Sequence, residues 1–280
     1  MKDQRMQHFL TTLAGIDGYH PLSDAKMSRI DQPESIVIIE ETDEIVAVGV
    51  VAVHEHTDGS SHWAVETTAS PGLRFPAFES QLLEATLGLV PGGEEVSVWS
   101  RRVSLDLALK AAGFSTSRQL AHYTVNLPVQ ERSHSFELRA FRNDDTQRIL
   151  AINASAFAGH REAAAMNEED FEALRGQAWF SAEGLVVAVE DSTITGFCWT
   201  RVHSGGDGEI FRIAVDPSKQ GSGIGSVLLH AGLTHLADDP RVKRGTLWVD
   251  LADGGAVRLY ERIGMEQESV NREFVRQPKR

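Results

Sequence analysis

The sequence has few of the features that mark secreted or membrane proteins. It contains one cysteine, Cys198, so no disulfide can form within the chain and a reducing compartment is indicated. Its longest apolar run, Ile45–Val53, is too short to cross a bilayer and is typical of a buried strand. The first residues, MKDQRMQHFLTTLAG, are too polar for a signal peptide. We therefore expect a cytoplasmic protein.

Positive charge is also scarce. The chain has 27 lysines and arginines against 40 aspartates and glutamates, which gives a net charge of −13. A polyanion is repelled by nucleic acid and by an anionic membrane, so we expect neither partner. The charge places no such limit on a small-molecule substrate. We also expect the protein to be a monomer.

The length and a repeated pattern predict two domains. A chain of 280 residues is long enough for one large domain or for two of about 140 residues each. The polar segment LPVQERSHSFE suggests a linker at 128–136, between domains at 1–127 and 137–280. The segments LDLALKAAGFS (105–115) and GAVRLYERIGME (255–266) share a helix, a glycine stop and a following strand. We interpret this match as a tandem duplication.

Helical and strand patterns alternate along both halves. Apolar residues at helical spacing predict helices over 2–14, 78–89, 105–112, 144–157, 168–174, 226–237 and 256–263. Strands are predicted over 35–40, 44–54, 61–67, 95–99, 119–127, 136–140, 185–190, 194–203, 209–215, 246–251 and 270–275. This order predicts an α/β protein with mixed sheets.

One stretch calls for a functional explanation: DGEIFRIAVDPSKQGSGIGSVLLHAGL, residues 207–233. A strand ends before Asp216-Pro217, and glycines then precede an apolar helix. Glycines allow close approach of a ligand, and consecutive N–H groups that open a helix attract anions. We therefore expect a phosphate-bearing ligand at residues 220–226.

Three interpretations of this loop compete. The first is a glycine-rich loop without a ligand. The second is a dinucleotide site with Asp250 as the ribose-binding acid, but Asp-Pro and three polar residues separate the strand from the glycines. The third fits best, because Gln220-x-x-Gly223-x-Gly225 after Val-Asp-Pro resembles the acetyl-CoA pyrophosphate loop of the GNAT N-acetyltransferases.

The resemblance extends beyond this loop. The segments INASAFAGHREAAAMNEEDFEALRGQAWFSAEGLVVAV, GFCWTRVHSG and LWVDLADGGAVRLYERIGM, with VWSRRVSLDLALKAAGF and RQLAHYTVNLP earlier, resemble the mycothiol synthase family. Its members have two tandem GNAT domains, each a mixed, mostly antiparallel sheet flanked by helices. The resemblance implies that the C-terminal domain uses acetyl-CoA, without a metal, to acetylate the cysteinyl amine of cysteinyl-glucosaminyl-inositol.

The resemblance also assigns site residues. It implies that Glu209 and Tyr260 are catalytic. It implies acetyl-CoA contacts for Ile213, Ala214, Val215, Gln220, Gly221, Ser222, Gly223, Ile224, Gly225, Ser226, Asp253, Gly254, Gly255, Ala256, Val257 and Arg258. It implies acceptor contacts for Asp24, Glu162, Arg201, Glu209 and Trp248.

Several positions depart from the family pattern. Ser222 replaces arginine and shifts the phosphate contacts toward backbone N–H groups, whereas Arg201 replaces lysine and keeps the charge. Trp248 replaces tyrosine, Asp253 replaces asparagine, and Cys198 replaces histidine.

The N-terminal half departs further. Its corresponding segment, VETTASPGLRFPAFES, lacks the glycine motif and has Pro76 where N–H groups should cluster, and Leu109 occupies the tyrosine position. We expect this half not to catalyse acetyl transfer, and its acetyl-CoA binding to be weakened or lost.

The residue types suit acetyl transfer to an amine. A carboxylate such as Glu209 can take the proton of an amine whose pKa is about 7.7–8.0. Tyr260 can supply a proton to the leaving thiolate, and a backbone N–H near Val215 can stabilise the oxyanion. Without the surrounding motif, the residues alone favour a solvated strand-end glutamate for Glu209 and a core aromatic residue for Tyr260.

Other functions stay open on the residues alone. An acetyltransferase for another amine, such as a protein N-terminus or an aminoglycoside, would use the same pair of catalytic residues. A non-catalytic acyl-CoA sensor would keep residues 213–226 without turnover. His54, His56 and His62 could contribute to a metal site, but the sequence offers no evident further ligands beside them. We therefore interpret them as ordinary surface residues. Cys198 lies mid-strand, which predicts a buried apolar role.

Overall fold

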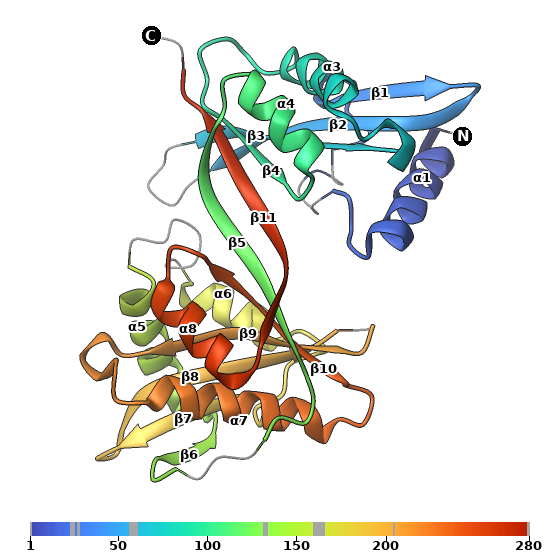
Figure 1. Cartoon of the computed structure of the whole chain (residues 1–280). Helices are drawn as coiled ribbons and strands as arrows, with labels where there is room; N and C mark the ends of the chain where they lie inside the picture. Colours follow the sequence, from blue (N-terminus) through green and yellow to red (C-terminus); the bar gives the residue numbers. More distant parts are fainter. Residues whose placement is uncertain are drawn as a thin grey trace. The chain divides into compact units, whose positions relative to one another are not determined.

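The computed structural model describes residues 2–22, 26, 29–55, 61–130, 134–158, 166–203 and 205–278 (Figure 1). Contacts group the chain into two compact units. Unit 1 contains Met1–Gln119 and Val270–Arg280, and unit 2 contains Leu120–Ser269. Among the described residues, none of the helices combines the length and the apolar character that crossing a membrane requires.

Unit 1 is a mixed sheet with helices. Its strands follow the order β1-β2-β3-β4-β11, and only β3 and β4 are parallel in this set. Its elements are α1 (Lys2–Asp17), η1 (Pro33–Ser35), β1 (Ile36–Glu41), β2 (Glu44–Glu55), β3 (Ser61–Ala69), η2 (Pro71–Leu73), α3 (Pro76–Leu87), β4 (Val96–Ser100) and α4 (Val103–Ala111). The first part of β5 (Ser115–Asn126) and the last part of β11 (Glu266–Arg276) complete it.

Unit 2 has the same kind of architecture. Its sheet runs β5-β10-β9-β8-β7-β6, and the β9–β10 pair is parallel. Its elements are β6 (Glu137–Ala140), η3 (Asn143–Asp145), α5 (Thr146–Ala156), α6 (Glu168–Arg175), β7 (Leu185–Glu190), β8 (Thr193–Val202), β9 (Asp207–Val215), η4 (Pro217–Lys219), α7 (Ile224–Asp238), β10 (Arg244–Asp250) and α8 (Gly254–Ile263). Helix α7 covers one face of β7, β8 and β9, while α5 packs against β8 and β9 (Figure 1).

The element order repeats, as the sequence predicts. In unit 1, β3, η2, α3, β4, α4 and β5 follow one another, and β9, η4, α7, β10, α8 and β11 follow in the same order in the second half of the chain. Both α4 and α8 are followed by a glycine with positive φ, +83° at Gly113 and +94° at Gly264. The glycine stops are therefore confirmed.

The compact units do not follow the predicted domain ranges of 1–127 and 137–280. Residues 120–126 of β5 pair with β10 and belong to unit 2, and residues 272–276 of β11 pair with β4 and belong to unit 1. Each unit therefore completes its sheet with a strand segment from the other half of the sequence. The domain ranges and the linker at 128–136 stay predictions.

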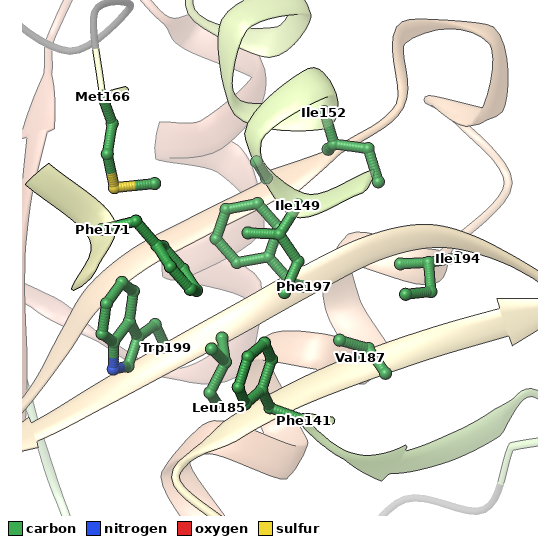
Figure 2. Close-up of a cluster of buried hydrophobic side chains, with 11 residues drawn as sticks. Phe141, Ile149, Ile152, Met166, Phe171, Leu185, Val187, Ile194, Phe197 and Trp199 are labelled. Atoms are coloured by element: carbon green, nitrogen blue, oxygen red, sulfur yellow. The ribbon is translucent and has the colours of Figure 1, made fainter. Parts of the chain in front are cut away.

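The core of unit 2 is aromatic and lies on the α5 and α6 side of the sheet (Figure 2). Trp199 is fully buried at its centre. Its ring centroid lies 5.2 Å from that of Phe171, 5.8 Å from Trp179, 5.9 Å from Phe180 and 5.5 Å from Phe211. Such tilted and edge-on pairs add to the burial of apolar area. They give strands β8 and β9 a rigid support.

The opposite face of these strands packs closely against α7. Cys198 on β8 is fully buried there, and burial raises the pKa of its thiol to about 12. The thiol therefore stays protonated at neutral pH, and the predicted apolar role of Cys198 is confirmed.

The close approach of α7 to the sheet depends on Gly232. A Cβ atom at this position would lie 2.5 Å from the Cys198 Sγ and 2.9 Å from the Ile210 Cδ1. We predict that Gly232→Ala lowers the free energy of unfolding by about 1–3 kcal/mol, because the helix must move away from the sheet. Urea denaturation followed by tryptophan fluorescence measures this change.

Gly15→Ala is the matched control, because Gly15 also lies in a helix and a Cβ there meets nothing within 4 Å. This control should be neutral or stabilising by up to about 1 kcal/mol. Equal stability of Gly232→Ala and the wild type would contradict the close packing of α7.

Candidate active site

The candidate site begins where β9 and β10 part. Their parallel register runs from Asp207↔Arg244 to Glu209↔Thr246 and ends there. Strand β9 continues to Val215, paired with β8, whereas β10 continues to Asp250, paired with β5. In the described part of the sheet, residues 210–215 therefore have a strand partner on one side only. Such an edge offers backbone groups to an extended ligand.

The side chain of Asp216 stabilises the start of the loop after β9. Its carboxylate accepts hydrogen bonds from the Ser218 N–H at 2.9 Å and the Ser218 hydroxyl at 2.7 Å, and it pairs with the Arg148 guanidinium at 2.5 Å. These contacts, those of Ser218 first, lower the pKa of Asp216 to about 2. The carboxylate therefore stays charged at neutral pH and fixes the start of the loop.

The loop itself turns through two left-handed glycines. Gly221 has φ +81° and Gly223 has φ +94°, a conformation that residues with a side chain rarely adopt. Gly223 precedes α7 and provides no side-chain cap. The N–H groups of Gly221, Gly223, Ile224 and Gly225 make no backbone hydrogen bond to a described residue. They lie at the positive end of a 15-residue helix, which suits an anion.

The Ser222 hydroxyl takes no part in this cluster of N–H groups. It donates to the Lys219 carbonyl at 2.7 Å and so points back into the loop. Lys219 itself pairs with Glu190. The described groups that the loop leaves available are therefore backbone N–H groups.

Glu209 lies at the last residue of the parallel register and is only 12% exposed. Its Oε2 atom lies 2.7 Å from the Arg201 Nη2 and 2.9 Å from the His203 Nε2. Among the described residues, no hydrogen-bond donor contacts its Oε1 atom. One carboxylate oxygen is thus held by two neighbours and the other is available.

The guanidinium of Arg201 lies against two adjacent aromatic rings. Its guanidinium carbon lies 5.1 Å from the centre of the Phe211 ring and 5.6 Å from that of Trp179. A cation over aromatic faces is attracted by their quadrupoles. The aromatic core around Trp199 therefore extends to the ion pair with Glu209 and orients it.

Three of the predicted acceptor residues, Arg201, Glu209 and Trp248, share one face of the sheet. A Cβ at Gly208 would meet Leu236 of α7, and a Cβ at Gly245 would meet Leu233 of α7. Because side chains alternate along a strand, Glu209 and Trp248 point to the opposite face. Arg201, the cross-strand partner of Glu209, points there too. The structure thus brings these three predicted residues to one face.

Trp248 is 37% exposed on this face. The ring of His122, its cross-strand neighbour on β5, lies 4.7 Å from the tryptophan ring, and His122 Nδ1 lies 2.9 Å from Glu268. The tryptophan is therefore supported by a neighbouring strand.

Tyr260 lies on α8 and is buried at 6% exposure. Burial raises its pKa, and the charge of Asp253 raises the pKa further. Its hydroxyl is therefore protonated at neutral pH. Among the described residues, no hydrogen-bond partner contacts this hydroxyl. It is a donor that is available to a ligand.

The N-terminus of α8 is already occupied by a carboxylate. Asp253 accepts hydrogen bonds from the N–H groups of Gly255 at 3.1 Å and Ala256 at 2.9 Å. This N-cap stabilises α8 and fills the anion position there. The predicted contacts of Asp253–Arg258 with acetyl-CoA are therefore expected along the side of the helix.

Two predicted residues cannot be placed, and three residues of the site were not predicted. Asp24 and Glu162 lie outside the described residues. The sequence did not point to His203, Trp179 or Phe211. In the segment TRVH, His203 follows Arg201 by two residues, and in an extended chain this spacing directs both side chains to the same side. This spacing is the one sequence signal that points to His203.

Unit 1 lacks these features at the corresponding positions. The last pair of its parallel β3–β4 register is Val65↔Val98, and Val65 is buried. Helix α3 begins with Pro76, which has no N–H, and its first turn carries the fully buried Glu79, paired with Arg102 at 2.9 Å. The first turn of α3 thus has one N–H donor fewer and carries a carboxylate that is already paired. Leu109, at the tyrosine position, is fully buried.

Comparisons with known proteins agree with this geometry. The model of the acetyltransferase (GNAT) family matches residues 147–265. A mycothiol acetyltransferase of Thermobispora bispora is 32% identical over 275 residues, covering 92% of this chain and 90% of that protein.

Two solved structures share the fold over nearly the whole chain. A GCN5-related N-acetyltransferase from Sphaerobacter thermophilus has a TM-score of 0.72 at 20% identity and covers 95% of this chain and 90% of its own. A tandem GNAT protein from the clavulanic acid biosynthesis pathway has a TM-score of 0.66 at 14% identity, with 99% and 96% covered. The predicted tandem GNAT fold is confirmed.

Proposed function

We infer that this chain, which belongs to the mycothiol acetyltransferase family of GNAT N-acetyltransferases, transfers the acetyl group of acetyl-CoA to the cysteinyl amine of cysteinyl-glucosaminyl-inositol. The observation that carries this inference is the position of Glu209. It lies where β9 and β10 part, beside an unpaired strand edge that leads to the glycine loop. The Glu209 carboxylate, the unpaired edge of residues 210–215 and the N–H groups of the glycine loop thus follow one another along the chain.

The residues along this path fit acetyl-CoA. The N–H groups of Gly221 and Gly223–Gly225, within the predicted contact range Gln220–Ser226, suit its pyrophosphate. The backbone of Ile213, Ala214 and Val215 suits the amides of the pantetheine arm, because β9 has no strand partner on that side. The same backbone can donate a hydrogen bond to the oxyanion that forms when the amine attacks the thioester.

Glu209 accepts the proton of the attacking amine in this proposal. An α-amino group has a pKa of about 7.7–8.0 and is partly protonated at neutral pH. The available Oε1 atom can receive its proton directly or through one water molecule. Arg201 and His203 hold the other oxygen, so the carboxylate keeps its orientation while it acts.

Tyr260 assists the departure of the CoA thiolate. Its raised pKa keeps the phenol protonated, so it can donate a hydrogen bond to the sulfur. Complete proton transfer is uphill, because an ordinary thiol has a pKa of about 8.5, below that of the phenol. Tyr260 therefore acts as a hydrogen-bond donor to the developing negative charge.

The acceptor is proposed to lie on the sheet face of Arg201, Glu209 and Trp248. Arg201 can donate to the hydroxyls of the sugar and inositol rings, and Trp248 offers an apolar surface to a ring. Asp24 and Glu162 are proposed as further acceptor contacts. We propose a cytoplasmic monomer in which unit 1 does not catalyse.

Release of CoA thiol tests the proposed function. With acetyl-CoA and cysteinyl-glucosaminyl-inositol, we expect fast release and a product heavier by one acetyl group, measured by thiol titration and mass spectrometry. A protein N-terminal peptide and an aminoglycoside serve as competing acceptors. Faster release with either of these would replace the proposed acceptor. Tight binding of acetyl-CoA with no release for any amine would favour a sensor instead.

Glu209→Gln tests the role of the carboxylate. We expect kcat to fall by about 10²–10⁴-fold, because the amide cannot accept the proton, with the Kd for acetyl-CoA unchanged. Glu266→Gln, at an exposed position of the same unit, is the control and should keep wild-type turnover. Equal turnover of Glu209→Gln and the wild type would remove Glu209 from the mechanism.

A further inference from the structure

His203 shares the oxygen of Glu209 that Arg201 also contacts. We propose that His203 is a positioning residue that holds the Glu209 carboxylate for proton transfer while Arg201 engages the acceptor. This role rests on the proposed function of the site. It assigns a task to a side chain that no motif identified.

The strand geometry brings His203 to Glu209. Arg201 and Glu209 are cross-strand partners on β8 and β9. His203 lies one residue beyond the end of β8 and two residues after Arg201, a spacing that directs both side chains to the same side. The His203 Nε2 atom lies 2.9 Å from the Glu209 Oε2, which is hydrogen-bond distance. The imidazole therefore reaches the carboxylate diagonally across the strand pair.

The backbone at His203 is fixed. Its N–H donates to the Asp207 carbonyl at 2.9 Å, and its own carbonyl accepts from the Gly206 N–H at 2.9 Å. The first of these bonds joins the end of β8 to the start of β9, so the imidazole directly follows the strand pair that carries Glu209. A side chain mounted in this way can hold its partner within the small displacement that catalysis tolerates.

Arg201 and His203, which both contact the Glu209 Oε2 atom, have different roles in this proposal. Arg201 has five N–H groups and is the residue on this face that suits the acceptor hydroxyls, and its Nη2 atom also lies 3.4 Å from the His203 Nε2. If Arg201 also donates to the acceptor, its contact with the Glu209 Oε2 atom is weakened. His203 then retains the Oε2 atom and leaves Oε1 directed at the amine.

An imidazole suits this position better than a second permanent cation. It can donate a hydrogen bond while it is uncharged, whereas an ammonium or guanidinium always carries a charge near neutral pH. Two permanent cations on one carboxylate would oppose its protonation, because nearby opposite charges stabilise the ionised form. The His203–Glu209 contact thus orients the carboxylate without adding that opposition.

Three substitutions at His203 separate orientation from mere packing. Glutamine carries an amide nitrogen close to the place of the imidazole Nε2, whereas asparagine carries it close to that of Nδ1 and cannot reach Glu209. We expect His203→Asn and His203→Ala to lower kcat by about 10–100-fold, and His203→Gln to restore most of it. The Kd for acetyl-CoA should not change in any of them. The side chain is 41% exposed, so folding should be retained.

A double-mutant cycle tests whether His203 acts through Glu209. We expect His203→Ala to cause no further loss of kcat in the Glu209→Gln background, because the residue it positions is already inactive. An equal loss in both backgrounds, or wild-type turnover of His203→Ala, would overturn the positioning role alone. Absence of acceptor-dependent turnover in the wild type would overturn the proposed function, and this role with it.

Discussion

The structure of unit 2 depends on the separation of two parallel strands. If β9 and β10 stayed paired beyond Glu209, the backbone of residues 210–215 would be satisfied on both sides. Their separation leaves one edge of β9 without a strand partner in the described sheet. Unpaired backbone groups need partners, so this edge favours an extended polar ligand. The glycine loop continues the same path with N–H groups that suit a phosphate.

The two faces of the unit 2 sheet are packed differently. Helix α7 covers one face so closely that glycines are needed at Gly208, Gly232 and Gly245. The other face carries the aromatic core around Trp199, which supports Arg201 and through it Glu209. Arg201, Glu209 and Trp248 thereby share the face opposite α7, and the packing on both sides keeps their spacing rigid.

The sequence predicts most of the elements and much of the site. Strand and helix patterns are local, so the repeat, the glycine stops and the loop at 220–226 can be recognised from the residues alone. The exchange of strand ends between the units cannot, because β5 pairs with β10 more than a hundred residues away. The contact of His203 with Glu209 also depends on the register of β8 against β9, which includes a bulge between Trp199 and Thr200. The sequence pattern does not determine such a register.

The two units differ in the loop and helix that come after the first strand of each parallel pair. Unit 2 has two left-handed glycines and a helix with available N–H groups, whereas unit 1 has Pro76 and the buried Glu79. The same order of elements thus begins its first helix with available N–H groups in unit 2 and with a proline and a buried, paired carboxylate in unit 1. We propose that only the loop of unit 2 holds acetyl-CoA.

Hydrogen exchange with and without acetyl-CoA tests this claim most directly. Mass spectrometry of peptic fragments should show slower exchange over residues 211–226 when acetyl-CoA is bound, and unchanged exchange over residues 66–80. Unchanged exchange over 211–226, or equal protection of 66–80, would contradict a single acetyl-CoA site in unit 2.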